Sequence, residues 1–241
     1  MAMAAQDIAS TGGLRSLART NLAEEAHREL ARGLSSGRFL PGARLGIREL
    51  AEEMGISPTP IREALQQLVA EGAFTQIAGR SFRVPVLGAQ DYLELRRLRV
   101  MLEGDAAAEA ALCITPAAIA ELEALHDQLA QARAVEDYKT ALSYNQQFHL
   151  RICAESGNQR LLRIVEGLWL QMGPLLNVLY PRIRTPGGAP GAHPHVQVTQ
   201  ALHRRDPEAA RRALQDDIMG GAEDILAALR ARDTDPPGPR D

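Results

Sequence analysis

The chain has 241 residues, of which 45% are hydrophobic and 24% are charged, and its formal net charge is −3. This composition is typical of a globular protein with one large domain or two modest ones, and the slightly acidic balance argues against a protein that binds polyanions without specificity. No stretch approaches the roughly 20 apolar residues that span a membrane, and the N-terminal segment lacks the basic and apolar regions of a signal peptide. We therefore expect a cytoplasmic protein with no membrane partner.

The predicted N-terminal domain covers residues 20–86 and follows a flexible N-terminus at residues 1–19. Apolar residues recur at helical spacing in the segment LAEEAHRELARGLSSGRF, which predicts a helix that starts near Leu22 and ends at the Ser-Ser-Gly turn. The segment LPGARL is predicted to be a turn. The segment GIRELAEEMG predicts a second short helix, which Gly55 stops.

The segment GISPTPIREALQQL places two prolines at the start of an amphipathic pattern. A proline in the first turn of a helix removes no intrahelical hydrogen bond, so Pro58 and Pro60 are predicted at the first and third positions of a helix capped by Ser57. This helix leaves four polar residues exposed: Thr59, Arg62, Gln66 and Gln67. Two short helices joined by a glycine turn predict a helix-turn-helix, whose second helix reads bases in the major groove of DNA.

The segment GAFTQIAGRSFRVPVL predicts a small β-hairpin directly after the third helix. Its two short strands flank a tight basic turn at Gly79 and Arg80, which corresponds to a wing. Exposed arginine and glutamine also occur on small helical domains that do not bind DNA, and this alternative stays open for the helices alone. The basic hairpin favours the DNA-binding interpretation.

The sequence PGARLGIRELAEEMGISPTPIREALQQLVAEG, followed by GRSFRV, resembles the N-terminal winged helix of the GntR transcription regulators. The resemblance implies DNA contacts from the arginine that opens the second helix, from polar residues of the third helix, and from the wing. In this chain these residues are Arg48, Ser57, Thr59, Arg62 and Gly79, and Arg80 adds a positive charge. Many members carry an arginine directly after the serine, where this chain has Pro58, so one base contact is missing and the operator sequence is not fixed.

From Asp91 onward the chain is rich in alanine and leucine in long periodic runs, which predicts an all-helical bundle of about six helices over residues 87–231. The fold class is therefore mainly α, with the winged helix-turn-helix in front of the bundle. Residues 232–241 contain several prolines and charges and are predicted to be a disordered tail.

Four polar residues interrupt the apolar stripes of three predicted helices in the bundle: Asn145, His149, His195 and Asp217. An unpaired carboxylate that faces a core is costly, so Asp217 should have a partner. The four side chains could converge on a divalent metal, because Asn145 and His149 lie one helical turn apart. The alternatives are hydrogen-bonded core histidines and an ion pair of Asp217 with an arginine such as Arg99.

The segment NQQFHLRICAESGNQRLL and the span from His195 to RRDPEAARRAL resemble the FCD effector domain of the FadR subfamily of GntR regulators. The resemblance implies a divalent transition metal such as zinc, nickel or manganese, held by Asn145, His149, His195 and Asp217, beside a cavity for a small organic acid. Family members with a metal have a histidine where this chain has Asp217, which leaves the identity of the metal open.

Arg99 matches an arginine of the family and is expected either to bind the acid or to pair with Glu103. His193, in the Pro- and Gly-rich loop, and His203 are given no role.

Together these features predict a sequence-specific transcription regulator, with repression relieved by ligand as the commoner family behaviour. It is expected to bind an inverted-repeat operator as a homodimer, because one winged helix covers few base pairs.

The alternative is a metal-dependent enzyme that uses the four polar residues to activate water. It is weaker, because no separate general base stands out and the winged helix would have no purpose. A DNA-binding architectural protein with a degenerate pocket is a third alternative. The sequence does not encode the effector, the operator or the sign of the response.

Overall fold

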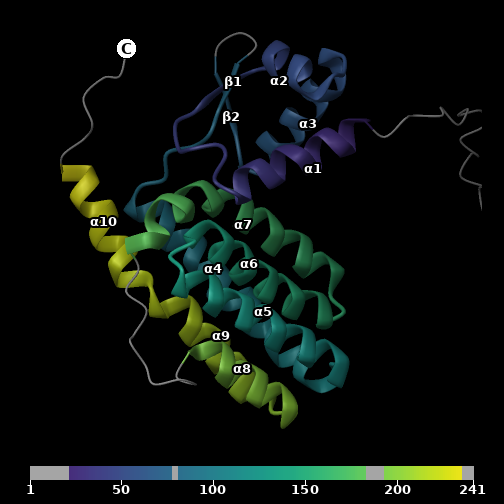
Figure 1. The fold of residues 1–241 in the computed structure, drawn as a ribbon, viewed down its shortest axis with the longest axis vertical. Coiled ribbons are helices and arrows are strands. Elements are labelled where there is room, and N and C mark those ends of the chain that lie inside the picture. The colour runs from purple at the N-terminus through teal and green to yellow at the C-terminus, as the bar shows by residue number, and fades with distance from the viewer. Residues whose placement is uncertain (1–21, 78–80, 183–192, 235–241) are drawn as a thin grey trace, which may run out of the picture.

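The computed structural model describes residues 22–77, 81–182 and 193–234, which form two parts (Figure 1). The N-terminal part contains three helices and a small sheet. Its elements are α1 (Leu22–Ser35), β1 (Arg44–Gly46), α2 (Ile47–Met54), α3 (Pro58–Ala70), β2 (Thr75–Ile77) and β3 (Ser81–Arg83). The predicted N-terminal flexible segment lies outside the described residues.

The turn between α2 and α3 has the conformation that the sequence predicted. Gly55 lies in the left-handed region with φ of 64°, and its amide bonds back to the carbonyls of Ala51 and Glu52. Glycine adopts this conformation without strain from a Cβ, so it ends α2 sharply. Ser57 then occupies the N-cap position of α3 without a side-chain capping hydrogen bond, and Pro58 is the first residue of the helix. The predicted helix-turn-helix is confirmed.

The sheet has three strands in the order β1-β3-β2, all antiparallel, where the sequence predicted a two-stranded hairpin. The additional strand is β1, which begins in the segment predicted to be a turn and ends at Gly46, the first residue of the segment predicted to be a helix. Leu45 of β1 pairs with Phe82 of β3, and both side chains are buried. A strand of three residues is too short to show alternation in the sequence, and only its pairing with β3 defines it.

The C-terminal part is a bundle of helices, drawn in teal to yellow in Figure 1. In the described residues it contains seven α-helices and one short 3₁₀ segment. These are α4 (Ala89–Cys113), α5 (Pro116–Ala134), α6 (Tyr138–Glu155), α7 (Gln159–Leu179), the 3₁₀ turn Tyr180–Arg182, α8 (Pro194–His203), α9 (Pro207–Gly220) and α10 (Ala222–Thr234).

The bundle differs from the prediction at its C-terminal end. The sequence predicted about six helices, and the added helix arises because Gly220 and Gly221 divide the last periodic run into α9 and α10. Glycine weakens a helix interior by roughly 1 kcal/mol relative to alanine. Helix α10 also runs three residues into the segment predicted to be a tail; residues 235–241 lie outside the described residues.

Helix α7 belongs to the bundle and also makes direct contacts with the N-terminal part. Leu170 packs against the N-terminal core, Gln171 donates a hydrogen bond to the carbonyl of Glu71 (2.9 Å), and Asn177 donates to the carbonyl of Ser35 (2.8 Å). A Cβ on Gly173 would lie 3.2 Å from the Leu34 carbonyl oxygen, so the two backbones approach closely there. The two parts are therefore joined by direct contacts of α7 as well as by the chain.

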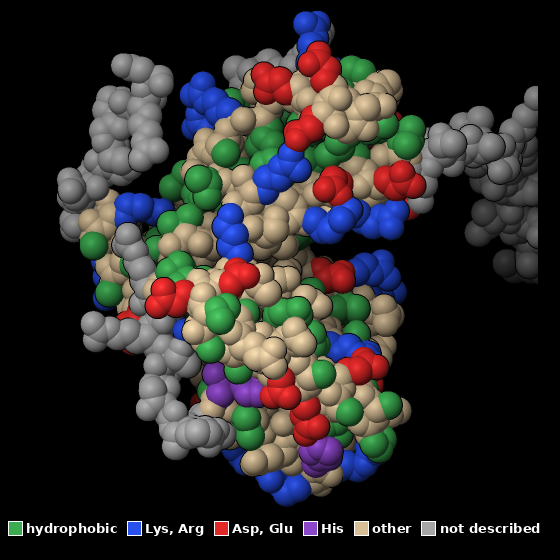
Figure 2. All heavy atoms as spheres, in the orientation of Figure 1, with side chains coloured by type: hydrophobic (Ala, Val, Ile, Leu, Met, Phe, Trp, Pro, Cys, Tyr) green, Lys and Arg blue, Asp and Glu red, His purple; other side chains and the backbone are tan. Residues whose placement is uncertain are grey.

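A groove lies beside this contact, between α1 and the helices α6 and α7. Figure 2 shows the indentation between the two parts, with basic and acidic side chains interspersed along its edges. Within the described ranges, none of the helices combines the length and apolar character needed to cross a membrane.

Candidate functional site

Four of the residues predicted to contact DNA are described by the structure. They lie on α2 and at the start of α3. Arg48, Ser57, Thr59 and Arg62 are all exposed. The opposite face of α3 is held against the N-terminal core by fully buried side chains: Ile61, Leu65 and Leu68. A recognition helix contacts base edges mainly with its N-terminal residues, where Thr59 and Arg62 lie. Gly79 and Arg80 fall outside the described residues.

Three of the four polar residues predicted to converge, His149, His195 and Asp217, meet in the interior of the bundle. His149 of α6, 1% exposed, is flanked by two carboxylates. Its Nδ1 lies 2.7 Å from Oε2 of Glu103 on α4, and its Nε2 lies 2.9 Å from Oδ2 of Asp217 on α9. His195 of α8 is fully buried, and its Nε2 is 3.6 Å from the same Asp217 oxygen. The expected partner of Asp217 is therefore histidine, and three helices deliver the three side chains.

Glu103 links this group to an arginine. Arg99 lies one turn earlier on α4, and its Nε is 2.5 Å from Oε1 of Glu103. Its guanidinium also lies over the ring of Trp169, 3.8 Å from the centroid. A buried carboxylate without partners would be strongly destabilising, and Glu103 instead has partners on both oxygens.

Electrostatics keeps the buried acids charged. Burial alone would raise the pKa of Glu103, but Arg99 and His149 hold it below its usual value. Burial likewise opposes the charge on Asp217, and the two histidines hold its pKa well below the usual range. Burial also disfavours a charged His149, yet Glu103 and Asp217 more than offset this and raise its pKa. The charged forms of Glu103, His149 and Asp217 therefore stabilise one another against the cost of burial.

The arrangement fits a divalent metal ion. In a tetrahedral site with metal–ligand distances of about 2.0–2.1 Å, ligand atoms lie about 3.3 Å apart. The separations at Asp217, 2.9 Å to His149 and 3.6 Å to His195, bracket that value. Both ring nitrogens of His195 are buried and have no hydrogen-bond partner among the described residues. Glu103 would orient His149 from behind, as carboxylates behind metal-binding histidines commonly do.

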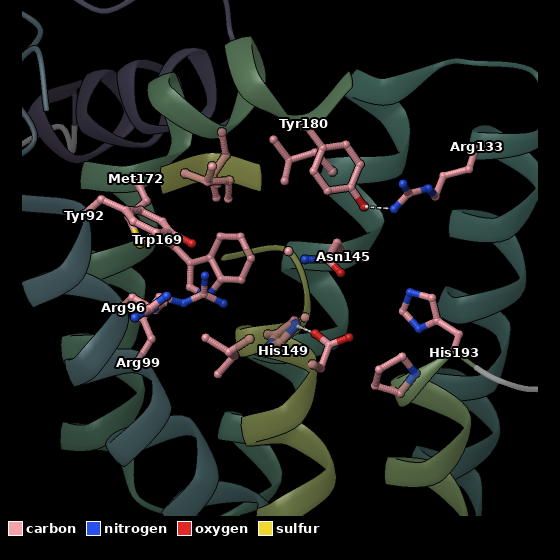
Figure 3. Close-up of a pocket in the computed structure, with 18 residues that line it drawn as sticks. Tyr92, Arg96, Arg99, Arg133, Asn145, His149, Trp169, Met172, Tyr180 and His193 are labelled. Atoms are coloured by element: carbon pink, nitrogen blue, oxygen red, sulfur yellow. Dashed lines mark hydrogen bonds and ion pairs between the residues drawn. The ribbon is translucent and has the colours of Figure 1, made fainter. Parts of the chain in front are cut away.

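A cavity of about 110 Å³ lies beside this group, and Asn145, His149 and Asp217 form part of its wall. Figure 3 shows Arg96 and Arg99 on one side of it and His193 on the other. Burial and the neighbouring His195 lower the pKa of His193 to about 4, so this ring is neutral. The volume is small beside the roughly 300–1,000 Å³ of pockets for drug-sized ligands, which favours a small molecule.

The cations around the cavity are not equivalent. Arg99 is engaged by Glu103 and Trp169, so the ion pair that the sequence offered as the alternative to acid binding is present. Arg96, one turn earlier on α4, has a buried Nη1 atom with no hydrogen-bond partner in the part of the chain that the structure describes. Arg133 of α5 donates to the Tyr180 hydroxyl at 3.2 Å. Arg96 therefore has a donor available to a ligand.

Sequence reasoning located four polar residues but missed their surroundings. Glu103 was considered only as a partner of Arg99, and its contact with His149 connects helices 46 residues apart, which periodicity does not reveal. Arg96 and His126 interrupt no clear apolar stripe. His193, assigned to a loop without a role, caps α8 and lines the cavity.

Comparisons with known proteins agree with both parts of the fold. Residues 22–84 match the family described as bacterial regulatory proteins, gntR family, and residues 94–220 match the FCD domain. The chain is 34% identical to the HTH-type transcriptional regulator McbR of Escherichia coli (strain K12) over 204 residues, 85% of this chain and 92% of that protein. It is 27% identical to the "Probable D-xylose utilization operon transcriptional repressor" of Paenarthrobacter nicotinovorans, over 82% of this chain and 86% of that protein.

Solved structures give the same result. The structure of E. coli McbR/YncC superposes with a TM-score of 0.78 at 33% identity, covering 89% of this chain and 99% of that one. A putative GntR regulator from Rhodococcus sp. RHA1 shares the fold, with a TM-score of 0.72 at 24% identity, over 87% of this chain and 99% of that one. These relatives are regulators, which disfavours the metal-dependent enzyme. The chain belongs to the GntR family of bacterial regulatory proteins and is a DNA-binding transcription regulator with an FCD effector domain.

Proposed function

We propose that the chain is a metal-containing repressor that releases its operator when a small organic acid binds in the cavity of the helical domain. The observation that carries this proposal is the buried, unpartnered Nη1 of Arg96, which lies in the wall of the same cavity as His149 and Asp217. The relative from Paenarthrobacter nicotinovorans is likewise named a probable transcriptional repressor. Because bacterial operators lie in the cytoplasm, this function would place the chain there.

The DNA contacts would come from Arg48, Ser57, Thr59 and Arg62, all exposed at the start of α2 and α3, with Gly79 and Arg80 contributing from the wing. Arginine reads guanine edges or phosphates by paired hydrogen bonds, and threonine and serine accept or donate single ones. A homodimer would place two such surfaces on the two halves of an inverted repeat, which gives the length of site that selective binding requires.

The metal would be held by His149, His195 and Asp217, with Asn145 one turn before His149 on the same cavity wall. These nitrogen and oxygen donors suit zinc, nickel or manganese. When bound, such an ion supplies a positive charge that attracts a carboxylate. His149 would offer its Nε2 to the ion, while Glu103 holds the other ring nitrogen, Nδ1, at 2.7 Å.

The acid would bind between the metal position and Arg96. A guanidinium donates two parallel hydrogen bonds to a carboxylate, which fixes both the charge and the orientation of the ligand. Arg99 would support this site indirectly, because its charge is already balanced by Glu103 at 2.5 Å. Trp169 and Leu176 would contact the apolar part of the ligand, since both line the cavity.

Helix α7 would transmit the binding event to the winged helix. Trp169, Met172 and Leu176 line the cavity, whereas Gln171 and Asn177 on the same helix bond to the backbone of the N-terminal part. A small displacement of α7 by the ligand therefore changes the orientation of α1 and α3. The ligand shifts the equilibrium only by the difference between its affinities for the two arrangements.

The first test is selection of bound duplexes from a random DNA library at near-physiological salt, which suppresses non-specific phosphate binding. We expect one enriched inverted repeat. That repeat then serves as the probe in a fluorescence anisotropy titration of the manganese- or zinc-loaded protein with a panel of small carboxylates, and at least one should release the DNA.

Arg96→Gln should abolish that release while leaving operator affinity unchanged. Arg97→Gln, which removes an exposed arginine from the adjacent position, is the matched control and should respond as the wild type. An unchanged response in Arg96→Gln would contradict the assignment of this arginine. Absence of any enriched repeat would contradict the proposed operator binding.

A further inference from the structure

A second group of imidazoles lies next to the proposed metal position and shares one member, His195, with it; its other two members have no role in the function proposed above. It consists of His126 on α5, His193 at the start of α8, and His195 on α8. The ring centroid of His126 lies 5.1 Å from that of His193 and 5.5 Å from that of His195, and the last two are 4.5 Å apart. One nitrogen from each ring lies within 4.8 Å of the others.

Within the described part of the chain, three ring nitrogens of this histidine trio lack the hydrogen bonds that buried imidazoles normally have. Nδ1 of His126 and both ring nitrogens of His195 are buried without a hydrogen-bond partner among residues 22–77, 81–182 and 193–234. His193 faces the backbone amide of His195 through Nδ1 at 3.2 Å, a long hydrogen bond that a bound ion could replace. Most buried polar atoms in proteins are hydrogen-bonded, so several unpaired ring nitrogens that converge are a candidate set of ligands.

The trio is also held in place from outside. The ring of Phe148 stacks on His195 with centroids 3.7 Å apart and an interplanar angle of 4°. His195 is fully buried, whereas His126 and His193 are partly exposed. The trio thus has one rigid ligand at its base and two ligands toward solvent, which gives an ion a route of entry.

The two groups offer different chemistry. The metal position proposed above, the first group, contains two imidazoles, His149 and His195, with oxygen donors from Asp217 and Asn145. The trio contains three imidazoles and no carboxylate. Imidazole ligands suit copper and nickel, whereas oxygen ligands suit manganese, and copper binds most tightly of the first-row divalent ions.

We propose that His126, His193 and His195 form a second metal position, which takes an imidazole-preferring divalent ion such as Cu²⁺ or Ni²⁺. His195 belongs to both groups, and a neutral imidazole has one lone pair. The two positions therefore compete for His195, and the chain holds one ion at a time in this region. An ion at the trio withdraws a ligand from the position that faces the acid cavity.

The test is to load the full untagged chain with Cu²⁺ and to record its electron paramagnetic resonance spectrum. The hyperfine coupling counts the imidazole nitrogens bound to the copper. A glycine buffer removes weakly held copper. We expect one copper per chain, coupled to three imidazole nitrogens. The first group alone would give two, because it contains two histidines. A two-nitrogen spectrum of the wild type would overturn the proposal.

Two variants probe the trio separately. His126→Asn removes one ligand, and His193→Asn removes another while asparagine keeps the N-cap of α8. Each should lower copper affinity at least tenfold and reduce the coupling to two nitrogens. His203→Asn, which removes an exposed histidine from the same helix, is the control and should change neither. Three coupled nitrogens in both trio variants would also overturn the proposal.

The proposed sensor site is tested in a separate arm with Mn²⁺. Asp217→Asn should weaken Mn²⁺ binding and leave the three-nitrogen copper spectrum intact, because Asp217 is not in the trio. If Asp217→Asn removes the copper signal as well, a single position binds both ions and the second position is refuted. Failure of the acid response alone would leave the copper result unaffected.

Discussion

The surface proposed to read DNA and the group proposed to sense the ligand are built in opposite ways. Arg48, Thr59 and Arg62 project from an apolar core and are exposed. Glu103 and His149 are at most 1% exposed and hold each other in place. An exposed reading residue can change without affecting the fold, whereas a buried sensor residue also stabilises it. Function and stability are therefore separable in the N-terminal part and coupled in the bundle.

The largest effect is expected where that coupling is strongest, at Glu103. The change Glu103→Gln removes a buried charge that balances both Arg99 and His149. Breaking a buried ion pair from one side typically costs about 3–5 kcal/mol, and we expect a loss of that order in the free energy of unfolding. Trp169, the single tryptophan, lies 5.4 Å from the His149 ring and reports the urea transition by fluorescence.

The matched control is Glu121→Gln, the same chemical change at an exposed ion pair with Arg151. Exposed pairs contribute about 0–1 kcal/mol, so its transition should stay close to that of the wild type. Equal losses in the two variants would show that the buried group is not structurally coupled, and the contrast between the two parts would fail.

A smaller effect of a different kind is expected at Arg62. The change Arg62→Ala should weaken binding to the selected operator by about 1–3 kcal/mol, or roughly 5- to 150-fold, through loss of a base or phosphate contact. The free energy of unfolding should change by less than about 0.5 kcal/mol, because the side chain is exposed.

Fluorescence anisotropy on the operator and on a scrambled duplex measures the DNA effect, and urea unfolding measures the stability. Arg97→Ala, an exposed arginine of the bundle, is the control and should bind as the wild type. Operator affinity and selectivity that survive Arg62→Ala would contradict the assignment of the recognition helix.

The same contrast explains what the sequence could predict. The winged helix is made of local signals: a glycine turn, prolines at a helix start, and apolar residues at helical spacing. Pro58 and Gly55 act within a few residues of their own positions, so the pattern determines their structure. The sequence did not reveal the strand β1, because the strand with which it pairs, β3, is distant along the chain: Arg44 pairs with Arg83 and Gly46 with Ser81.

The group proposed to sense the ligand, which includes Glu103, His149 and Asp217, depends on contacts between helices that are distant along the chain. Periodicity showed that His149 and Asp217 face inward, but not that they face each other across 68 residues. Nothing in the sequence around His126 distinguishes it from a surface residue of α5, and only the crossing of α5 and α8 places it near His195. The sequence pointed to Arg99 but left two roles open, acid binding and pairing with Glu103. The structure shows the pairing with Glu103.

The smallest effects are expected at two glycines of α7, which test whether the two parts are truly joined there. Gly167 has no atom within 4 Å of an added Cβ, whereas a Cβ on Gly173 would lie 3.2 Å from the Leu34 carbonyl oxygen and 3.3 Å from the Ser35 Cα. Alanine is favoured over glycine in a helix by roughly 0.8–1.0 kcal/mol, so Gly167→Ala should stabilise the chain by up to that amount.

Gly173→Ala has the same gain in helix propensity but forces the backbone of α1 away from α7. Overpacking of close contacts costs about 1–3 kcal/mol, so the net change should be a loss of about 1 kcal/mol. Thermal unfolding of the two variants should therefore shift in opposite directions. If Gly173→Ala stabilises the chain as much as Gly167→Ala does, α1 does not rest on α7, and the ligand signal must reach the winged helix by another path.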